Sequence, residues 1–179
     1  MDEIQSLKKQ YDEMVQASFE DLEAKILDVR PTASSMKELD DQPMMLENHL
    51  TNFELCQMSL RISIRTLIKR LEFNHRDVQS LKVQADQLFD IILATPLRST
   101  LCMPLLILGI TSYSPCQRQA MSARYERLIE IYAVKNLHRS WEVIQLVWNR
   151  IDENVAHGKP CHVDWCEICD DLGWNFSYS

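Results

Sequence analysis

TLCMPLLILGITSYSPCQRQAMSARYERLIEIYAVKNLHRSWEVIQLVW, residues 100–148, holds the longest apolar block of the chain and its clearest helix-boundary signals. Thr100 is a suitable N-cap for a helix that begins at Leu101. Pro104 falls within the first turn of that helix, where its missing N–H is tolerated. The residues that follow are apolar on nearly every side as far as Ile110. The pattern predicts a central helix that is buried on most of its faces.

A second helix is predicted to begin after residue 114. Ser114 supplies an N-cap, Pro115 occupies the first helical position, and Gln117 is the capping-box partner. Apolar residues then recur at spacings of three and four as far as Tyr132. Asn136 is predicted to be the C-cap.

A third helix, antiparallel to the second, is predicted from the stripe of Leu137, Trp141, Ile144, Trp148 and Ile151. Two tryptophans seven residues apart on one stripe favour core packing, with a ligand-stacking wall as the alternative. The residues that we expect to anchor the core are Pro104, Gly109, Trp141, Trp148 and Trp165.

Two amphipathic helices are predicted before this stretch, over residues 45–71 and 78–92. In the first, Arg61, Arg65 and Lys69 stand four residues apart on a face separate from the apolar stripe. Such a basic row is typical of a solvated face or of pairing with neighbouring acids. Phosphate contact is the alternative, although no aromatic residues are interleaved with the row.

The first 44 residues divide into two segments. Residues 1–30 show three/four apolar spacing and are predicted to form an amphipathic helix that ends at Arg30-Pro31. Docking on the core is the favoured role, and pairing in a coiled coil is the alternative, although Ser18 and Lys25 interrupt a strict heptad. Residues 31–44 are polar and acidic and are predicted to be a linker.

Composition is consistent with this helical pattern. The chain has 179 residues, 46% of them hydrophobic, with three glycines and six prolines. So few turn-forming residues disfavour sandwiches and barrels. The sequence predicts an all-α fold, a single helical domain of about six to seven packed helices.

The net charge of −7 is unevenly distributed along the chain. Residues 1–55 carry 13 acidic and 5 basic side chains, residues 56–139 carry 6 and 12, and residues 140–179 carry 7 and 2. A basic middle between acidic ends predicts pairing within the molecule. So acidic a chain lacks the electrostatic footprint of a nucleic-acid-binding domain.

No membrane span or secretory signal is expected. The longest nearly apolar run, Leu101–Ile110, is about half of the ~20 residues that a membrane helix needs. Six cysteines in a chain of this length do not indicate a disulfide scaffold. These features favour a soluble intracellular protein with reduced cysteines.

The C-terminal segment CHVDWCEIC is the most specific candidate for a metal site in the sequence. Its metal-ligating side chains are Cys161, His162, Cys166 and Cys169. They supply the soft and imidazole ligands of tetrahedral zinc, but no second, separated ligand pair accompanies them. Zinc is therefore a minor possibility beside cysteines packed in the core, and no other cofactor is expected.

The end of the same segment reads as a short closing helix. Asp164 is the predicted N-cap, with Glu167 three residues later, and Gly173 is the predicted stop. The sequence contains no glycine-rich phosphate loop, no nucleophile elbow and no His-Glu-x-x-His motif. The expectation is that the protein is not an enzyme.

The order of these features resembles the C-terminal part of the fungal-specific transcription factor regulatory domain, found in binuclear zinc-cluster proteins. The resemblance rests on the helix at 60–71, Pro104–Gly109, Arg118, Val147-Trp148 and the late Asp164-Trp165 and Leu172-Gly173. Such proteins carry a six-cysteine DNA-binding cluster near the N-terminus, whereas the first cysteine here is Cys56.

The resemblance implies a nuclear transcription regulator in which residues 45–179 form the regulatory domain. It would act through protein contacts, with the transcriptional machinery or by self-association, and with a small-molecule effector as a further possibility. It implies no sequence-specific DNA binding by this chain alone. A small metal- or ligand-binding helical protein, motivated by the C-terminal cysteines and by the tryptophan stripe, is the alternative.

Overall fold

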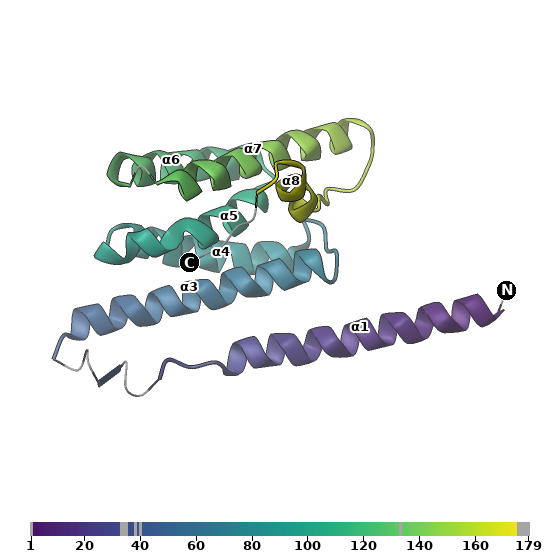
Figure 1. Cartoon of the computed structure of the whole chain (residues 1–179), viewed down its shortest axis with the longest axis horizontal. Coiled ribbons are helices and arrows are strands. Elements are labelled where there is room, and N and C mark those ends of the chain that lie inside the picture. Colours follow the sequence, from purple (N-terminus) through teal and green to yellow (C-terminus); the bar gives the residue numbers. More distant parts are fainter. Residues whose placement is uncertain (1, 33–35, 38, 40, 133, 175–179) are drawn as a thin grey trace.

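The computed structural model describes the chain except for residues 1, 33–35, 38, 40, 133 and 175–179 (Figure 1). The helices are α1 (Asp2–Asp28), α3 (Pro43–Leu67), α4 (Arg76–Leu93), the 3₁₀ helix η1 (Pro96–Leu101), α5 (Cys102–Ile110), α6 (Pro115–Ile131), α7 (Lys135–Ala156) and α8 (Trp165–Asp171). The predicted all-α fold is confirmed over these residues. Among them, no helix has the length and apolar character to cross a bilayer.

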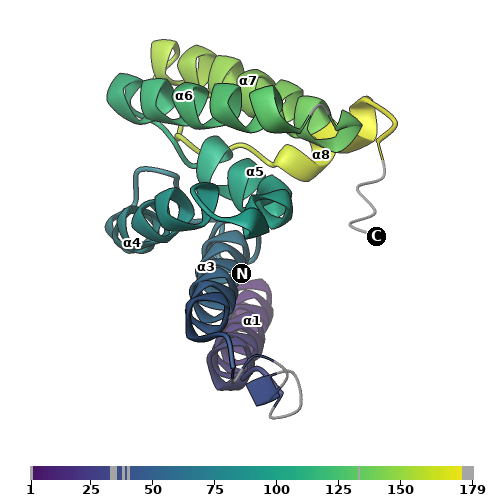
Figure 2. The same ribbon diagram turned by 90° about the vertical axis from the view of Figure 1, so that its left-hand side faces the viewer.

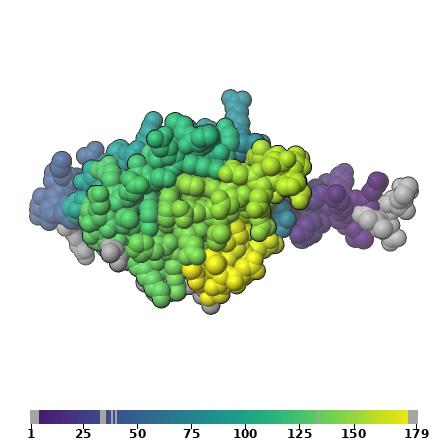
Figure 3. Space-filling model, turned by 90° about the horizontal axis from the view of Figure 1, so that it is seen from above, coloured from purple at the N-terminus to yellow at the C-terminus, as the bar shows by residue number. Residues whose placement is uncertain are grey.

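The helices stack in layers. Figures 1 and 2 show α6 and α7 side by side at the top, α4 and α5 beneath them, α3 below, and α1 outermost. α1 runs antiparallel to α3 and packs on it (Figure 1). The short helix α8 contacts α7. Seen from above, the N-terminal part of α1 projects beyond the rest of the molecule (Figure 3).

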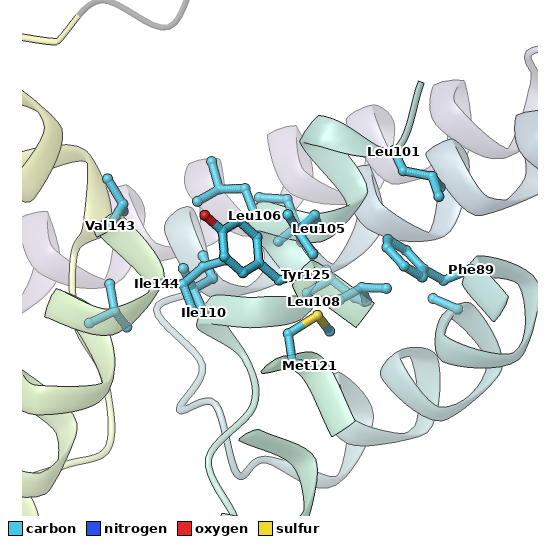
Figure 4. Close-up of a cluster of buried hydrophobic side chains, with 14 of the residues drawn as sticks. Phe89, Leu101, Leu105, Leu106, Leu108, Ile110, Met121, Tyr125, Val143 and Ile144 are labelled. Atoms are coloured by element: carbon cyan, nitrogen blue, oxygen red, sulfur yellow. The ribbon is translucent and has the colours of Figure 1, made fainter. Parts of the chain in front are cut away.

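The helix predicted at residues 101–110 is the centre of the stack. α5 contacts α3, α4, α6 and α7, and every residue from Pro104 to Ile110 is buried. Figure 4 shows its leucines beside Phe89 of α4, Met121 of α6 and Ile144 of α7. A helix that is apolar on nearly all sides needs neighbours on nearly all sides, and these layers supply them.

Gly109 allows α7 to approach α5 closely. A Cβ atom at this position would lie 2.4 Å from Cδ1 and 2.7 Å from Cγ1 of Ile144, which is fully buried. Non-bonded carbon atoms do not approach so closely, so a side chain here would force either Ile144 or the two helices to shift. The absence of a side chain therefore makes room for Ile144 between these helices.

Several predicted helix boundaries are confirmed. Ser114 and Gln117 form a complete capping box with Pro115 in the first turn of α6. Asp164 caps α8 by accepting a hydrogen bond from the backbone N–H of Cys166. Gly173 has a φ of 64°, the left-handed conformation expected of a residue that ends a helix.

Three other boundary predictions are wrong. Thr100 does not cap α5, because η1 precedes it, and the Thr100 hydroxyl donates instead to the carbonyl oxygen of Leu97. Asn136 lies inside α7, since α6 already ends at Ile131. α3 ends at Leu67 rather than at residue 71, and Arg70 with a φ of 50° turns the chain toward the next helix.

Candidate functional site

The basic row on α3 forms the surface on which α1 docks. Glu23 of α1 accepts hydrogen bonds from Nε of Arg61 at 3.1 Å and from a terminal nitrogen of Arg65 at 2.6 Å. All three side chains are mostly buried, with exposed fractions of 17%, 21% and 18%. The sequence left three interpretations of the basic row: a solvated face, pairing with acids, or phosphate contact. The structure shows that Arg61 and Arg65 pair with an acidic residue, Glu23.

The electrostatics of Glu23 follow from this geometry. Burial alone would raise the pKa of its carboxyl group, but the hydrogen bonds and charges of Arg65 and Arg61 outweigh burial and hold the pKa below its usual value. The carboxylate is consequently the ionised partner of two guanidinium groups. This pairing also shows the acidic N-terminal segment neutralising the basic middle.

Two further contacts extend the docking surface along α1. The Lys69 ammonium lies 3.9 Å from the centroid of the Phe19 ring, and Phe19 is only 2% exposed. At the other end, the side-chain amide of Gln57 donates to the carbonyl oxygens of Ile26 and Val29 at 2.7 and 3.1 Å. The C-terminal half of α1 is thus held on α3 by ionic, cation–π and hydrogen-bond contacts.

An apolar groove lies beside the first half of α3, with a volume of about 500 Å³. This volume is within the roughly 300 to 1,000 Å³ of small-molecule sites. One wall is formed by the chain between α1 and α3 and the other by α3 itself. The residues that line the groove are Pro31, Met36, Leu39, Leu46, His49, Leu50, Asn52, Phe53 and Cys56.

Three polar groups interrupt this apolar lining: His49, Asn52 and Cys56. The Asn52 side-chain amide lies 2.8 Å from the Thr100 hydroxyl, which is also within hydrogen-bond distance of the carbonyl oxygen of Leu97. Burial raises the pKa of the Cys56 thiol, which therefore stays protonated near neutral pH. The groove combines apolar walls with a few polar groups, as small-molecule sites do.

The C-terminal cysteine segment docks on the end of α3 and on the connection between α3 and α4. The carbonyl oxygen of Cys161 accepts from the N–H of Phe73 at 3.2 Å, and Nε2 of His162 lies 2.9 Å from the carbonyl oxygen of Thr66. Cys166 is partly buried and Cys169 is buried. Backbone docking and core packing thus account for the environments of these side chains.

The chemistry of the thiols agrees with packing. Burial raises the pKa of Cys169 to about 11, with the neighbouring Cys166 and Asp170 adding to the rise. Burial first, and then nearby acids, raise the pKa of Cys166 as well. Within the described residues, no group of three or more histidine, cysteine or acidic side chains is placed to hold a metal ion.

The tryptophan stripe forms an aromatic stack over α5. The rings of Tyr125 and Trp141 stack at a centroid distance of 4.4 Å, and Trp141 meets Trp148 edge-on at 5.4 Å. The Trp148 indole N–H donates a 2.9 Å hydrogen bond to the carbonyl oxygen of Gly109. Pro104 and Gly109 are buried, while Trp141, Trp148 and Trp165 are half-buried and pack against the core.

One ionic network was missed at the sequence level. Lys82 is fully buried in α4, and its ammonium lies 2.7 Å from Asp86. Burial lowers the pKa of Lys82, opposed by the charge of Asp86. Arg124 of α6 pairs with both Asp86 and Asp90. The four-residue spacing of Lys82 and Asp86 could be seen in the sequence, but the burial of Lys82 and the pairing of Asp86 with Arg124 depend on how the helices pack.

The family model described as fungal specific transcription factor domain matches residues 2–179. The uncharacterized transcriptional regulatory protein C965.10 of Schizosaccharomyces pombe is 28% identical over 158 residues, which are 87% of this chain and 29% of that protein. The transcriptional activator protein UGA3 of Saccharomyces cerevisiae is 22% identical over 160 residues, which are 88% of this chain and 29% of that protein.

The chain thus spans less than a third of the length of these curated relatives. No solved structure matches it. The residues that carry the resemblance found in the sequence, from the helix at 60–71 to Leu172-Gly173, all lie within the region that the family model matches.

Proposed function

Because this chain belongs to the fungal specific transcription factor domain family, we propose that it is the regulatory domain of a nuclear transcription regulator. In this role the domain acts through protein contacts and changes the output of a larger protein, without contacting a DNA sequence itself. Two curated relatives that are named as transcriptional regulators support the role. The family match over nearly the whole chain is the observation that carries it.

The groove between residue 31 and Cys56 is the proposed input site of the domain. Its volume of about 500 Å³ suits one small-molecule effector. Apolar walls supply the area that drives binding, and His49, Asn52 and Cys56 are the polar groups that a ligand would meet. We expect a mainly apolar effector with at least one hydrogen-bonding group.

The position of the groove connects binding to the arrangement of α1. Pro31 and Met36 in one wall follow α1 directly, while Leu46 and Phe53 in the other wall belong to α3, on which α1 docks. A ligand that holds these walls together stabilises the arrangement in which it binds. Effector binding is thereby coupled to the position of α1, the outermost helix.

A tethered reporter assay tests the regulatory role. The chain is fused to a heterologous DNA-binding module in yeast, and the reporter is compared with that of the module alone. We expect a reproducible change in transcription, lost in a Gly109→Val variant that disrupts the core at Ile144. A reporter level equal to that of the module alone, from a fusion that accumulates normally in the nucleus, contradicts the proposal.

A further inference from the structure

α1 carries an exposed and mostly apolar stripe, interrupted by Ser18 and Lys25, that nothing in the described part of the chain covers. Its large apolar side chains are exposed to solvent: Leu7 by 61%, Tyr11 by 62%, Met14 by 60%, Leu22 by 37% and Val29 by 52%. Val29 continues the helical pattern beyond Asp28, because its N–H donates to the carbonyl oxygen of Lys25. The stripe therefore spans 23 residues of the helix, from Leu7 to Val29, or about 33 Å.

The stripe is separate from the docking face of α1. At 3.6 residues per turn, its members fall within about 80° of one another around the helix axis, and the face of Phe19, Glu23 and Ile26 is centred about 100° away. A second helix can therefore pack on α1 without displacing α3. Figures 1 and 2 show α1 as the outermost layer, with α3 on one side only.

The spacing of the stripe is symmetric about Ser18. Successive members follow at intervals of four, three, four, four, three and four residues. The members are Leu7, Tyr11, Met14, Ser18, Leu22, Lys25 and Val29. Reversing the direction of the helix leaves this spacing unchanged. A surface with this property is complementary to a second copy of itself related by a twofold axis at Ser18.

The chemistry of the stripe is complementary in the same register. With Ser18 facing Ser18, Leu7 lies opposite Val29 of the second copy, and Met14 lies opposite Leu22. Tyr11 lies opposite Lys25, whose stem and ammonium suit the face of an aromatic ring. The small side chain of Ser18 permits close approach of the two helices at the axis. Every apolar member thus meets an apolar or amphipathic residue.

The charge of the helix disfavours a lipid surface as the occupant. α1 carries eight acidic and three basic side chains, while helices that lie on anionic membranes carry a basic polar face.

We propose that α1 is the interface of a twofold dimer of this chain, in which two α1 helices pack antiparallel with Ser18 at the axis. The order of helices across the interface is then α3, α1, α1 and α3. Each α1 stays docked on its own α3 through Glu23, Arg61 and Arg65. The proposal is independent of any effector in the groove.

Mass measurement of the whole chain by sedimentation equilibrium gives the first test. We expect a concentration-dependent dimer, and Met14→Lys should raise its dissociation constant at least about tenfold, which corresponds to about 1.4 kcal/mol. Gln16→Lys is the matched control, since Gln16 is exposed on the opposite side of α1, and it should leave the constant unchanged. A monomer at all concentrations up to about 100 µM, where even weak specific pairs form, overturns the proposal.

Cysteine cross-linking tests the register. All variants carry Cys116→Ser, because Cys116 is the exposed native cysteine. Under mild oxidation, Ser18→Cys should cross-link with itself, and a mixture of Leu7→Cys and Val29→Cys should form the mixed dimer. Self-linking of Leu7→Cys alone would show a parallel pair. Equal cross-linking of Gln16→Cys and Ser18→Cys would show random collision. Either result overturns the proposal.

Discussion

The indole N–H of Trp148 donates a 2.9 Å hydrogen bond to the carbonyl oxygen of Gly109. The bond joins α7 to the central helix α5 at Gly109, the residue against which the Ile144 side chain of α7 packs. The same glycine also accepts a hydrogen bond from the N–H of Ser112. Helix spacing and aromatic packing in this protein therefore depend on one residue without a side chain.

Gly109→Ala should destabilise the protein by about 1 to 3 kcal/mol, because the new methyl group would overlap Ile144. Denaturant unfolding measures the loss. Ile144→Ala alone should lower the free energy of unfolding by about 2 to 5 kcal/mol through the cavity that it leaves. The two losses combined should be smaller than their sum by at least about 0.5 kcal/mol. Strict additivity would mean that Ile144 does not limit the spacing.

Glu23→Gln should weaken the docking of α1 by about 1 to 3 kcal/mol, since it removes the charged partner of both Arg61 and Arg65. Faster hydrogen exchange of the α1 amides reports the change directly. Asp12→Asn, an exposed change on the same helix, should alter exchange little. If both variants exchange alike, the ionic contact does not hold α1.

The docking of α1 should weaken in acid. The pKa of Glu23 is lower in the folded protein than its ordinary value of 4.5, so the folded state favours the ionised carboxyl group. The resulting stability is fully present above pH 4.5 and is lost as the pH falls through the folded pKa. Hydrogen exchange of the α1 amides measured against pH should show this loss. In Glu23→Gln, the part of the pH dependence that comes from Glu23 should disappear. An unchanged pH profile in the variant would assign the loss to other groups.

The cysteines should differ widely in reactivity. At pH 8 a maleimide should label the exposed Cys116 first and Cys169 last, because Cys169 is buried and its pKa is raised to about 11. Mass spectrometry of digested samples gives the labelling rate at each site. Partial denaturation should equalise the rates. Rapid labelling of Cys169 in the native protein would place α8 off the core.

Much of the helical framework could be predicted from local pattern. Ser114, Pro115 and Gln117 specify the start of α6 by direct hydrogen bonding and by backbone restriction, so neighbours in the fold do not alter the result. The all-apolar run before them required burial on all sides. Thr100 failed as a predicted cap because the preceding turn is a 3₁₀ helix, which the apolar period does not reveal.

The candidate sites were less predictable, because they depend on which helices meet. The row of Arg61, Arg65 and Lys69 was recognised, but its partners on α1 lie 38 or more residues earlier in the chain. The groove was not predicted, since its two walls come from a linker and a helix face that look ordinary in isolation. The cysteine segment was noticed for its residue types, whereas its contacts are with backbone groups of a distant connection.

The domain is proposed to regulate transcription in response to a ligand that occupies the groove. Cys56→Trp fills the groove from α3, and Val83→Trp, at an exposed position on α4, is the matched control. In the DNA-tethered reporter, we predict that Cys56→Trp shifts transcription away from the wild-type level while Val83→Trp does not. Identical reporter levels for wild type, both variants and the DNA-binding module alone would contradict the account.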